Sequence, residues 1–479
     1  MVKPAVLLIG GLDPQGCAGI TADIEAVNHH NCHALPLITA MTQQTSTGLT
    51  EMGAVHPTQF MAQYQNCVVD FDIKAIKIGL VPNLEIARCI KQILQQHDVP
   101  VVMDPVLASS SGGERVSGSV QAFVCLDLLE HITLLTPNLP ELNLLTGVAG
   151  SLQQAAAQLE QLGLNACLVK GGHADSNYAS DYFVSRQAAF YCYQRKFDAQ
   201  VRGTGCVLAA AIASHLACGQ DLRDAVVLAK AYVSRGIRNA QKAGPYRVID
   251  HSREALELRD LPKLCYQAEL IGQSFQFPSC PQRLGIYPVV DSSDWVQKLV
   301  DLDITTIQLR IKDQPADKIE AEISETVNYL KDKQVSFFVN DHWQQAIEHQ
   351  AYGVHLGQED LHDANLQAIA EAGLRLGVST HSYWELARAL AVNPSYIALG
   401  PIFETTSKQM PFSPQGIDRL HQWVRLLDSH YPLVAIGGID LERVEQLKDT
   451  GVGSVAMITA ITRANDYQQA IRSLLACWR

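Results

Sequence analysis

Short apolar runs recur through the C-terminal part of the chain, and nearly every run ends in a polar, charged or glycine residue. The runs are Leu284–Val290, Ile304–Leu309, Val335–Val339, Tyr352–Leu356, Arg375–Val378, Tyr396–Leu399, Leu433–Ile436 and Ser454–Ile458. The segments between them, such as Asp317–Lys331 and His381–Ala391, are long enough for the helical crossovers that parallel strands need. Eight strand–helix units predict a (β/α)8 TIM barrel, in which the chemistry takes place where the strands end.

The N-terminal part of the chain also alternates apolar runs with helical segments. Its runs are Ala5–Ile9, Leu35–Ile38, Ala75–Ile78, Val101–Met103, Ile132–Leu135 and Ala166–Val169. Short, nearly continuous apolar runs are typical of parallel strands that are buried on both faces, so we predict a doubly wound α/β sheet. Such a sheet binds ligands beyond the carboxyl ends of its strands.

A segment without either periodicity separates the two parts. Gly272–Pro281 contains Gln, Ser, Phe and Pro and follows a charged stretch. We therefore predict a domain at residues 1–262, a linker at 263–282 and a second domain at 283–479.

Composition is consistent with two α/β domains and limits the class of partner. Of the 479 residues, 47% are hydrophobic and 18% charged, which gives both domains ample core. The net charge of −12 argues against nucleic-acid or membrane partners, because either would need a basic surface.

The run Ala5–Ile9 is too short for a signal peptide or a membrane span, so we expect a cytoplasmic protein. Twelve cysteines without close paired spacing indicate mostly reduced thiols. The sequence is compatible with a homo-oligomer and does not decide the oligomeric state.

Two motifs of the first half place polar groups next to strand ends. The glycine-rich turn at residues 11–23, GLDPQGCAGITAD, allows a ligand to approach the backbone at a helix start, although such turns often only connect elements. Asp104 and the segment Thr136–Glu141 offer oxygen atoms suited to Mg²⁺. The alternative is that Asn138 caps a helix and Glu141 completes the cap.

A third motif, Gly203-Thr204-Gly205-Cys206, opens the apolar run Val207–Ala217. Successive amides at a helix start can surround the charge of a transferring phosphoryl group, and Lys170 supplies a cation at another strand end. Cys206 would lie at the positive end of the helix, where the pKa of a thiol tends to fall; the alternative is a buried helix cysteine.

These residues resemble the hydroxymethylpyrimidine and phosphomethylpyrimidine kinases of thiamine synthesis, within the ribokinase-like superfamily. The resemblance implies pyrimidine binding by Asp23 and Gln44, Mg·ATP at Asn138 and Glu141, phosphate contact by Lys170, and an anion hole at Gly203, Gly205 and Cys206, with Cys206 near the position of the base. Two ATP-dependent phosphorylations would convert hydroxymethylpyrimidine to its diphosphate.

Two positions depart from the pattern of these kinases. Cys17 stands where a glycine is usual, and Arg202 stands where a histidine is common. Two alternatives therefore stay open for this half: a kinase for a pyridoxal-type alcohol, and a pyrimidine-binding module without catalysis.

Polar residues follow the predicted barrel strands in register. Gln308, Arg310 and Lys312 alternate along one strand end and can converge on an anion, unless they form a solvated basic rim. Asp341 and Asp360 follow adjacent strands and could share Mg²⁺, unless Asp341 caps a helix. We interpret His355 and His381 as structural residues. The last strands end at Gly437-Gly438 and Thr459, where barrels commonly bind phosphate on backbone amides.

The second half resembles thiamine-phosphate synthase in the runs QLRIKD, VND, YGVHLGQEDL, LRLGVSTH, SYIALGPIF and VAIGGI. The resemblance implies Mg²⁺ at Asp341 and Asp360. It further implies that pyrophosphate is bound by Gln308, Arg310, Lys312, Asn340 and Lys408, with Thr405 and Ser407 in the same loop, the pyrimidine by Ser379, and the thiazole phosphate by Gly438 and Thr459. The whole chain would then be a bifunctional enzyme of thiamine biosynthesis.

Overall fold

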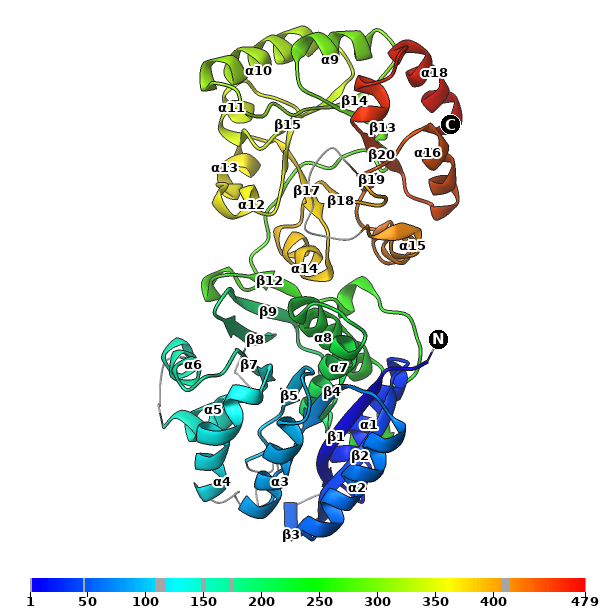
Figure 1. Ribbon diagram of the computed structural model, residues 1–479. Helices are drawn as coiled ribbons and strands as arrows, with labels where there is room; N and C mark the ends of the chain where they lie inside the picture. Colours follow the sequence, from blue (N-terminus) through cyan, green and yellow to red (C-terminus); the bar gives the residue numbers. More distant parts are fainter. Residues whose placement is uncertain are drawn as a thin grey trace. The chain divides into compact units, whose positions relative to one another are not determined.

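The computed structural model describes residues 2–45, 48–107, 118–147, 152–172, 176–405 and 414–478. It divides into two compact units, Met1–Gly272 and Gln273–Arg479 (Figure 1). Among the described residues, no helix is both long enough and apolar enough to cross a membrane.

The first unit is built on a ten-stranded sheet with the order β12-β9-β8-β7-β6-β5-β4-β1-β2-β3. Its strands are β1 (Ala5–Leu12), β2 (His33–Thr45), β3 (Gly48–Ala54), β4 (Ile73–Ile78), β5 (Val101–Met103), β6 (Leu134–Leu135), β7 (Ala166–Val169), β8 (Tyr178–Ser185), β9 (Ala189–Arg195) and β12 (Lys263–Cys265). The helices are α1 (Gly19–His29), α2 (Pro57–Asp70), α3 (Leu84–Leu94), α4 (Gly118–Phe123), α5 (Leu139–Thr146), α6 (Leu152–Gln161), α7 (Thr204–Ala217) and α8 (Leu222–Arg238). A separate hairpin, β10 (Gln241–Ala243) and β11 (Tyr246–Val248), follows α8.

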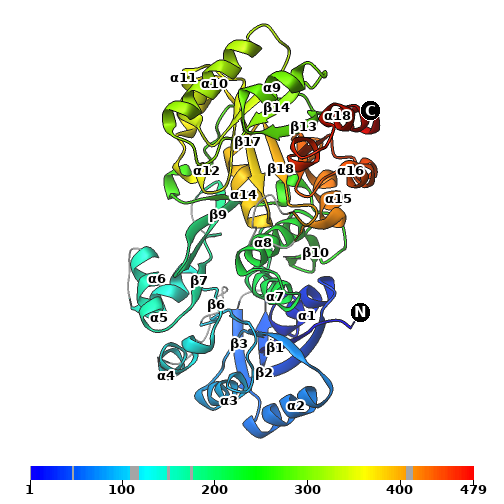
Figure 2. The ribbon, with the colours of Figure 1, turned by 45° about the horizontal axis from the view of Figure 1, so that its top comes forward.

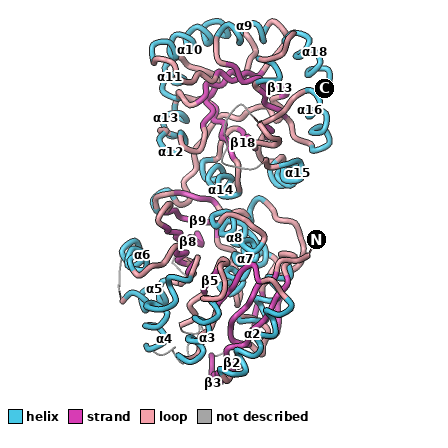
Figure 3. The backbone as a smooth tube through the Cα atoms, viewed as in Figure 1, coloured by secondary structure: helices cyan, strands magenta, loops and turns pink. Residues whose placement is uncertain are grey.

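The six predicted apolar runs form the parallel centre of this sheet, from β2 to β7. The antiparallel strands β3, β8, β9 and β12 add to its two edges and were not predicted (Figures 1 and 3). Strands at the edges lack a continuous apolar run, because they are buried on one face only or in part, as the mixed burial of β8 and β9 shows.

Helices cover both faces of the sheet. Ala5, Leu7 and Ile9 of β1 belong to a core with side chains of α2, α3, α5 and α6. Side chains alternate along a strand, so Val6 and Leu8 face the other layer, where α1, α7 and α8 pack together (Figure 2).

Each half of the predicted linker belongs to one of the two units. Lys263–Cys265 is strand β12 of the first sheet, whereas the later part of the segment contacts the barrel. The carbonyl oxygen of Pro278 accepts a hydrogen bond from Ser395 Oγ at 2.7 Å, and that of Ser279 accepts one from Arg375 Nε at 2.9 Å.

The second unit is the predicted barrel. Its strands β13 (Gly285–Val290), β14 (Thr306–Leu309), β15 (Ser336–Asn340), β16 (Gly353–Leu356), β17 (Arg375–Thr380), β18 (Tyr396–Leu399), β19 (Leu433–Ile436) and β20 (Ser454–Met457) close in sequence order. The helices around them are α9 (Ser293–Val300), α10 (Ala316–Leu330), α11 (Trp343–Glu348), α12 (Asp360–Asp363), α13 (Leu366–Glu371), α14 (Tyr383–Val392), α15 (Gly416–Leu427), α16 (Leu441–Leu447), α17 (Thr459–Thr462) and α18 (Tyr467–Trp478) (Figure 1).

Aromatic side chains fill the barrel because glycines leave room for them. Tyr287, Phe338 and Tyr396 belong to one buried cluster. A Cβ atom at Gly377 would lie 2.2 Å from the ring of Tyr396, and one at Gly353 would lie 2.7 Å from the ring of Phe338. The interior is therefore packed, and ligands must bind at the rim.

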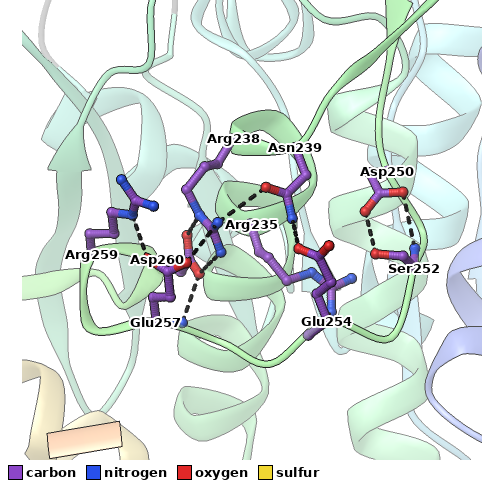
Figure 4. A network of polar contacts seen from close by, with 9 residues as sticks. All are labelled: Arg235, Arg238, Asn239, Asp250, Ser252, Glu254, Glu257, Arg259 and Asp260. Atoms are coloured by element: carbon purple, nitrogen blue, oxygen red, sulfur yellow. Dashed lines mark hydrogen bonds and ion pairs between the residues drawn. The ribbon is translucent and has the colours of Figure 1, made fainter.

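A polar network anchors the segment after α8 in the first unit (Figure 4). Arg238 donates two hydrogen bonds to the buried carboxylate of Asp260, from Nε at 2.8 Å and from Nη2 at 2.7 Å. The same carboxylate accepts a hydrogen bond from the backbone N–H of Glu257. Asn239 donates to Glu254 at 2.6 Å. The network fixes the last stretch of chain before β12.

We expect Asp260→Ala to destabilise the first unit by about 3 kcal/mol, because the mostly buried Arg238 loses its buried carboxylate partner and keeps only the half-exposed Glu257. Urea unfolding of the full chain, with the first unit followed by hydrogen exchange, measures the change. Glu254→Ala, at an exposed position of the same network, should cost less than about 1 kcal/mol. Equal costs for the two substitutions would contradict the assignment.

Candidate active sites

The first candidate site lies where the order of the parallel strands reverses. Strand β1 has β2 on one side and β4 on the other, and ligands of doubly wound sheets bind at such a point. Lys77 of β4 and Asp23 of α1 form an ion pair there, with 2.6 Å between Nζ and Oδ2 and side-chain exposures of 1% and 0%. The second oxygen of Asp23, Oδ1, is buried without a hydrogen-bond partner among the described residues.

The ion pair of Asp23 and Lys77 is charged at neutral pH. Burial raises the pKa of Asp23 to about 6, against the opposing effect of the Lys77 charge. Burial lowers the pKa of Lys77, but the carboxylate of Asp23 and the neighbouring Cys206 and Asp104 outweigh it, and the net shift is upward. Asp23 therefore presents an ionised, unpaired oxygen that can accept a hydrogen bond from a ligand.

Cys206 lies in the first turn of α7, beside this ion pair. Its thiol has a pKa raised to about 11, first because it is buried and then because Asp23 and Asp104 are negative, while Lys77 opposes the rise. The expectation of a lowered thiol pKa is therefore wrong. The positive helix end is outweighed by burial and by two carboxylates, which come from other elements.

A second cluster of charges lies next to the start of α7. Lys170 Nζ is 2.5 Å from Asp104 Oδ1 and 4.0 Å from Glu141 Oε2. A Cβ atom at Gly205 would lie 3.1 Å from Lys170 Nζ, which places the ammonium group against the amides of the helix start. Burial lowers the pKa of Lys170, but Asp104 and Glu141 reverse this and raise it.

Asn138 and Glu141 form the helix cap that was the alternative to a metal site. Asn138 Oδ1 accepts from the N–H of Glu141, and Glu141 Oε2 accepts from the N–H of Asn138, both at 2.8 Å. Burial raises the pKa of Glu141 to about 7, opposed by Lys170 and reinforced by Asp104. The two interpretations are compatible, because the capping carboxylate also faces Lys170.

The loop that carries Lys170 is fixed by a buried ion pair that the sequence did not reveal. Asp181 accepts a hydrogen bond from the N–H of Gly171 at 3.0 Å and pairs with Lys230 at 2.6 Å. Asp181 lies on β8 and Lys230 lies on α8, and neither element was predicted.

The two glycine turns of this site touch each other. Gly203 has φ 79°, and a Cβ atom there would lie 2.2 Å from the carbonyl oxygen of Cys17. Arg202, the residue before Gly203, stacks its guanidinium 4.5 Å from the ring centre of Tyr246. Gln44 is partly exposed and pairs with Leu49 on the part of β2 that extends beyond β1.

The second candidate site is the rim of the barrel formed by the carboxyl ends of its strands. Lys312 forms an ion pair with Asp341, and Asp341 lies close enough to Asp360 to raise the pKa of that carboxyl group. Asp341 has φ 65°, a conformation that is unusual for a residue other than glycine and is common at functional sites. The helix after β15 is capped at His342, without a side-chain cap, so Asp341 does not act as its cap.

The two rim carboxylates fit a divalent cation. Burial raises the pKa of Asp360, and the charge and hydrogen bond of Asp341 raise it further, while Lys312 opposes the rise. Two carboxylates held this close repel each other when both are ionised. Mg²⁺, which binds through one or two carboxylates together with phosphate oxygens, would stabilise the doubly ionised pair.

A buried chain of hydrogen bonds crosses the barrel and joins two predicted site residues. It runs from Ser379 to His355 (2.8 Å), to Tyr396 (2.7 Å), to Tyr287 (2.9 Å) and to Gln308 (3.3 Å). Burial lowers the pKa of His355 to about 4, so the ring is neutral.

His355 is thus more than a packing residue, whereas His381 pairs with Glu385 at the start of α14. The signal in the sequence was that His355 is a polar residue within an apolar strand run, although its partners could not be read from it.

The remaining rim residues lie on neighbouring strand ends. Arg310 follows β14 and Asn340 ends β15. A Cβ atom at Gly438 would lie 2.3 Å from the carbonyl oxygen of Glu404, so the segments after β18 and β19 touch. Thr459 begins α17, and Thr405 is partly exposed. Ser407 and Lys408 lie outside the described residues.

Each of the two units is similar to a known protein family. Residues 13–249 match the family model of phosphomethylpyrimidine kinase, and residues 286–461 match that of thiamine monophosphate synthase. The chain is 55% identical over 199 residues to thiamine-phosphate synthase from Serratia proteamaculans (strain 568), a match that covers 42% of this chain and 93% of that protein. It is 52% identical over 202 residues to thiamine-phosphate synthase from Pectobacterium atrosepticum, with 42% and 95% covered.

Among solved structures, pyridoxal kinase from Staphylococcus aureus in complex with pyridoxal shares the fold of the first unit. The TM-score is 0.51 at 24% identity, with 56% of this chain and 100% of that chain covered. The chain belongs to the thiamine-phosphate synthase family and joins a barrel of that family to a phosphomethylpyrimidine kinase domain, as a bifunctional enzyme of thiamine biosynthesis.

Proposed function

We propose that the first unit uses Mg·ATP to phosphorylate hydroxymethylpyrimidine and then its phosphate. The barrel then joins the resulting diphosphate to thiazole phosphate, with release of pyrophosphate. The observation that carries the proposal is the pair of neighbouring carboxylates, Asp341 and Asp360, beside Lys312 at the barrel rim. A diphosphate leaving group needs this combination of a cation and metal-binding oxygens.

In the kinase, the described residues divide the work between substrate and phosphate. Asp23 accepts a hydrogen bond from the pyrimidine through its unpaired oxygen, and Gln44 contacts the ring from β2. Lys170 and the amides at Gly203 and Gly205 bind the transferring phosphoryl group.

The metal of the kinase would be held by the charged cluster at the strand ends. Asp104 and Glu141 would bind Mg²⁺, with Asn138 holding Glu141 in place, and the ion would neutralise charge on the nucleotide phosphates. Cys206 is a protonated thiol at neutral pH, so we assign it to the anion hole and to contact with the reacting alcohol. Phosphoryl transfer depends mainly on position and charge, which makes this assignment chemically sufficient.

In the barrel, the chain's own residues bind the three parts of the reaction. Gln308, Arg310, Lys312, Asn340 and Lys408 hold the pyrophosphate, with Thr405 and Ser407 beside it, Ser379 holds the pyrimidine, and Gly438 and Thr459 hold the thiazole phosphate. Mg²⁺ at Asp341 and Asp360 would neutralise charge on the leaving group. As the C–O bond breaks, its electrons leave with the pyrophosphate, and the thiazole nitrogen forms the new bond to the pyrimidine methyl carbon.

The test is to incubate the full chain with hydroxymethylpyrimidine, ATP, Mg²⁺ and thiazole phosphate and to measure thiamine phosphate. A second reaction supplies the pyrimidine diphosphate directly, and a third replaces the pyrimidine by pyridoxal. Product in the first two reactions supports both activities. Product only from the supplied diphosphate overturns the kinase proposal, and ATP consumption with pyridoxal alone reassigns the kinase substrate.

We expect His355→Phe to lower kcat/KM of the barrel reaction roughly tenfold to a hundredfold, because Ser379 and Tyr396 each lose a hydrogen-bond partner. A positioning role predicts a fall in kcat with a stable fold, measured by steady-state kinetics and thermal unfolding. His381→Asn, which removes the ring contact with Glu385 and keeps the backbone hydrogen bond to it, is the control and should change kcat less. A purely structural role for His355 would appear as lost stability with kcat unchanged.

A further inference from the structure

Two cysteines lie at the ends of α1 and α7 that are remote from the kinase site. Cys32 follows α1. That helix begins within the glycine-rich motif at residues 11–23 and carries Asp23. Cys218 is the C-terminal cap of α7, which begins at the anion hole. The two helices pack side by side (Figure 2), and the sulfur atoms are 3.6 Å apart.

The two sulfur atoms differ in exposure. Cys32 is fully buried, with 0% exposure, whereas Cys218 is exposed to solvent. An oxidant can therefore reach Cys218, and Cys32 lies beside it as a resolving thiol. This is the arrangement of a redox-sensitive pair, an accessible sulfur next to a second cysteine.

The hydrogen bond between the two thiols shifts their pKa values in opposite directions. It lowers the pKa of Cys218 to about 7, against the effect of burial, and raises the pKa of Cys32. Either thiol can be the donor in this contact, and Cys32 Sγ also donates to the carbonyl oxygen of Ser214 at 3.6 Å. The lowered pKa favours the thiolate at Cys218, although the carboxyl end of α7 disfavours a negative charge. The thiolate is the nucleophilic form of cysteine.

We propose that Cys32 and Cys218 form a reversible disulfide when the protein meets a hydroperoxide, and that this bond lowers the kinase activity. Cys218 sulfur attacks the peroxide, an S–O bond forms, the O–O bond breaks, and an alcohol or water leaves. Cys32 sulfur then attacks the sulfenic acid, the S–S bond forms, and the hydroxyl group leaves as water. Two electrons pass from the sulfur atoms to the peroxide, and a dithiol reductant reverses the reaction.

The link to activity is geometric and rests on the proposed kinase function. Bond formation requires the sulfur atoms to approach from 3.6 Å to about 2.05 Å, which shifts the ends of α1 and α7 toward each other. The opposite ends are in close contact, because a Cβ atom at Gly203 would lie only 2.2 Å from the carbonyl oxygen of Cys17. The shift therefore reaches the contact between the two glycine turns.

The experiment treats the reduced full chain with hydrogen peroxide and maps disulfides by mass spectrometry without reduction. We expect a peptide linking Cys32 to Cys218, a several-fold fall in kinase rate, recovery with dithiothreitol, and an unchanged barrel rate with supplied diphosphate. Cys218→Ser should keep its kinase rate after peroxide, whereas the control Cys67→Ser should respond as the parent does. Cys32→Ser should instead accumulate sulfenic acid on Cys218, detected with dimedone.

The two parts of the proposal fail separately. Absence of the Cys32–Cys218 peptide, or equal inactivation of Cys218→Ser, overturns the switch. A complete disulfide with an unchanged kinase rate overturns the effect on activity alone. If the untreated chain has no kinase activity, the proposed kinase function fails, and peptide mapping still decides whether the disulfide forms.

Discussion

Asp360→Asn lowers the rate of thiamine phosphate formation from supplied pyrimidine diphosphate on the order of 10²–10³-fold, the cost of losing one group that stabilises developing charge. The substitution removes one of the two neighbouring carboxylates at the rim. Asp341→Asn should have an effect of the same size, because it removes the other rim carboxylate. It also releases Lys312 from its ion pair. The measurement is kcat at saturating Mg²⁺, combined with Mn²⁺ binding followed by electron paramagnetic resonance.

The control for this prediction lies in the same short helix. Asp363 is exposed and is the last residue of α12, which Asp360 begins, so Asp363→Asn should leave rate and metal binding unchanged. The double substitution at Asp341 and Asp360 should cost little more than either single one, because the two residues act as a unit. Full activity of Asp360→Asn with unchanged Mn²⁺ affinity would exclude this metal site.

The barrel and its rim could be predicted from the sequence because both depend on local patterns. A parallel strand that is buried on both faces is a continuous apolar run, and its next residue lies at the rim whatever the rest of the chain does. Arg310 and Asp341, which follow β14 and β15, were located at the rim in this way. The bond from His355 to Tyr396 could not be found, because it joins side chains across the closed barrel, 41 positions apart.

In the first unit, the sequence does not show which residue pairs with each buried charge. Lys77 lies within the apolar run of β4, where a lysine is unfavourable unless a carboxylate from elsewhere meets it. Its partner Asp23 is 54 positions away on α1. The pKa of Cys206 was misjudged for the same reason, since a helix start is visible in the sequence and the surrounding carboxylates are not.

Lys77→Met should abolish most of the kinase activity, with a fall on the order of 10²–10³-fold. Without Lys77, the opposing charge at Asp23 is lost, burial raises the pKa of Asp23 further, and the carboxyl is protonated at neutral pH. A protonated carboxyl group is a weaker hydrogen-bond acceptor than a carboxylate, so Asp23 binds the pyrimidine less well. ATP consumption with hydroxymethylpyrimidine measures the loss, and the barrel rate with supplied diphosphate serves as an internal control, since its site lies in the other unit.

Stability separates the role of the ion pair in function from its role in folding. Removing one partner of a buried ion pair costs about 3–5 kcal/mol, whereas replacing both by apolar residues is often neutral or stabilising. Lys77→Met should therefore destabilise the first unit, and Lys77→Met with Asp23→Leu should recover much of the stability while the kinase stays inactive. Lys74→Met, on the same strand but half exposed, should affect neither property. If the double variant regained kinase activity along with stability, Lys77 and Asp23 would be a folding device only, and the pyrimidine would have to be bound elsewhere.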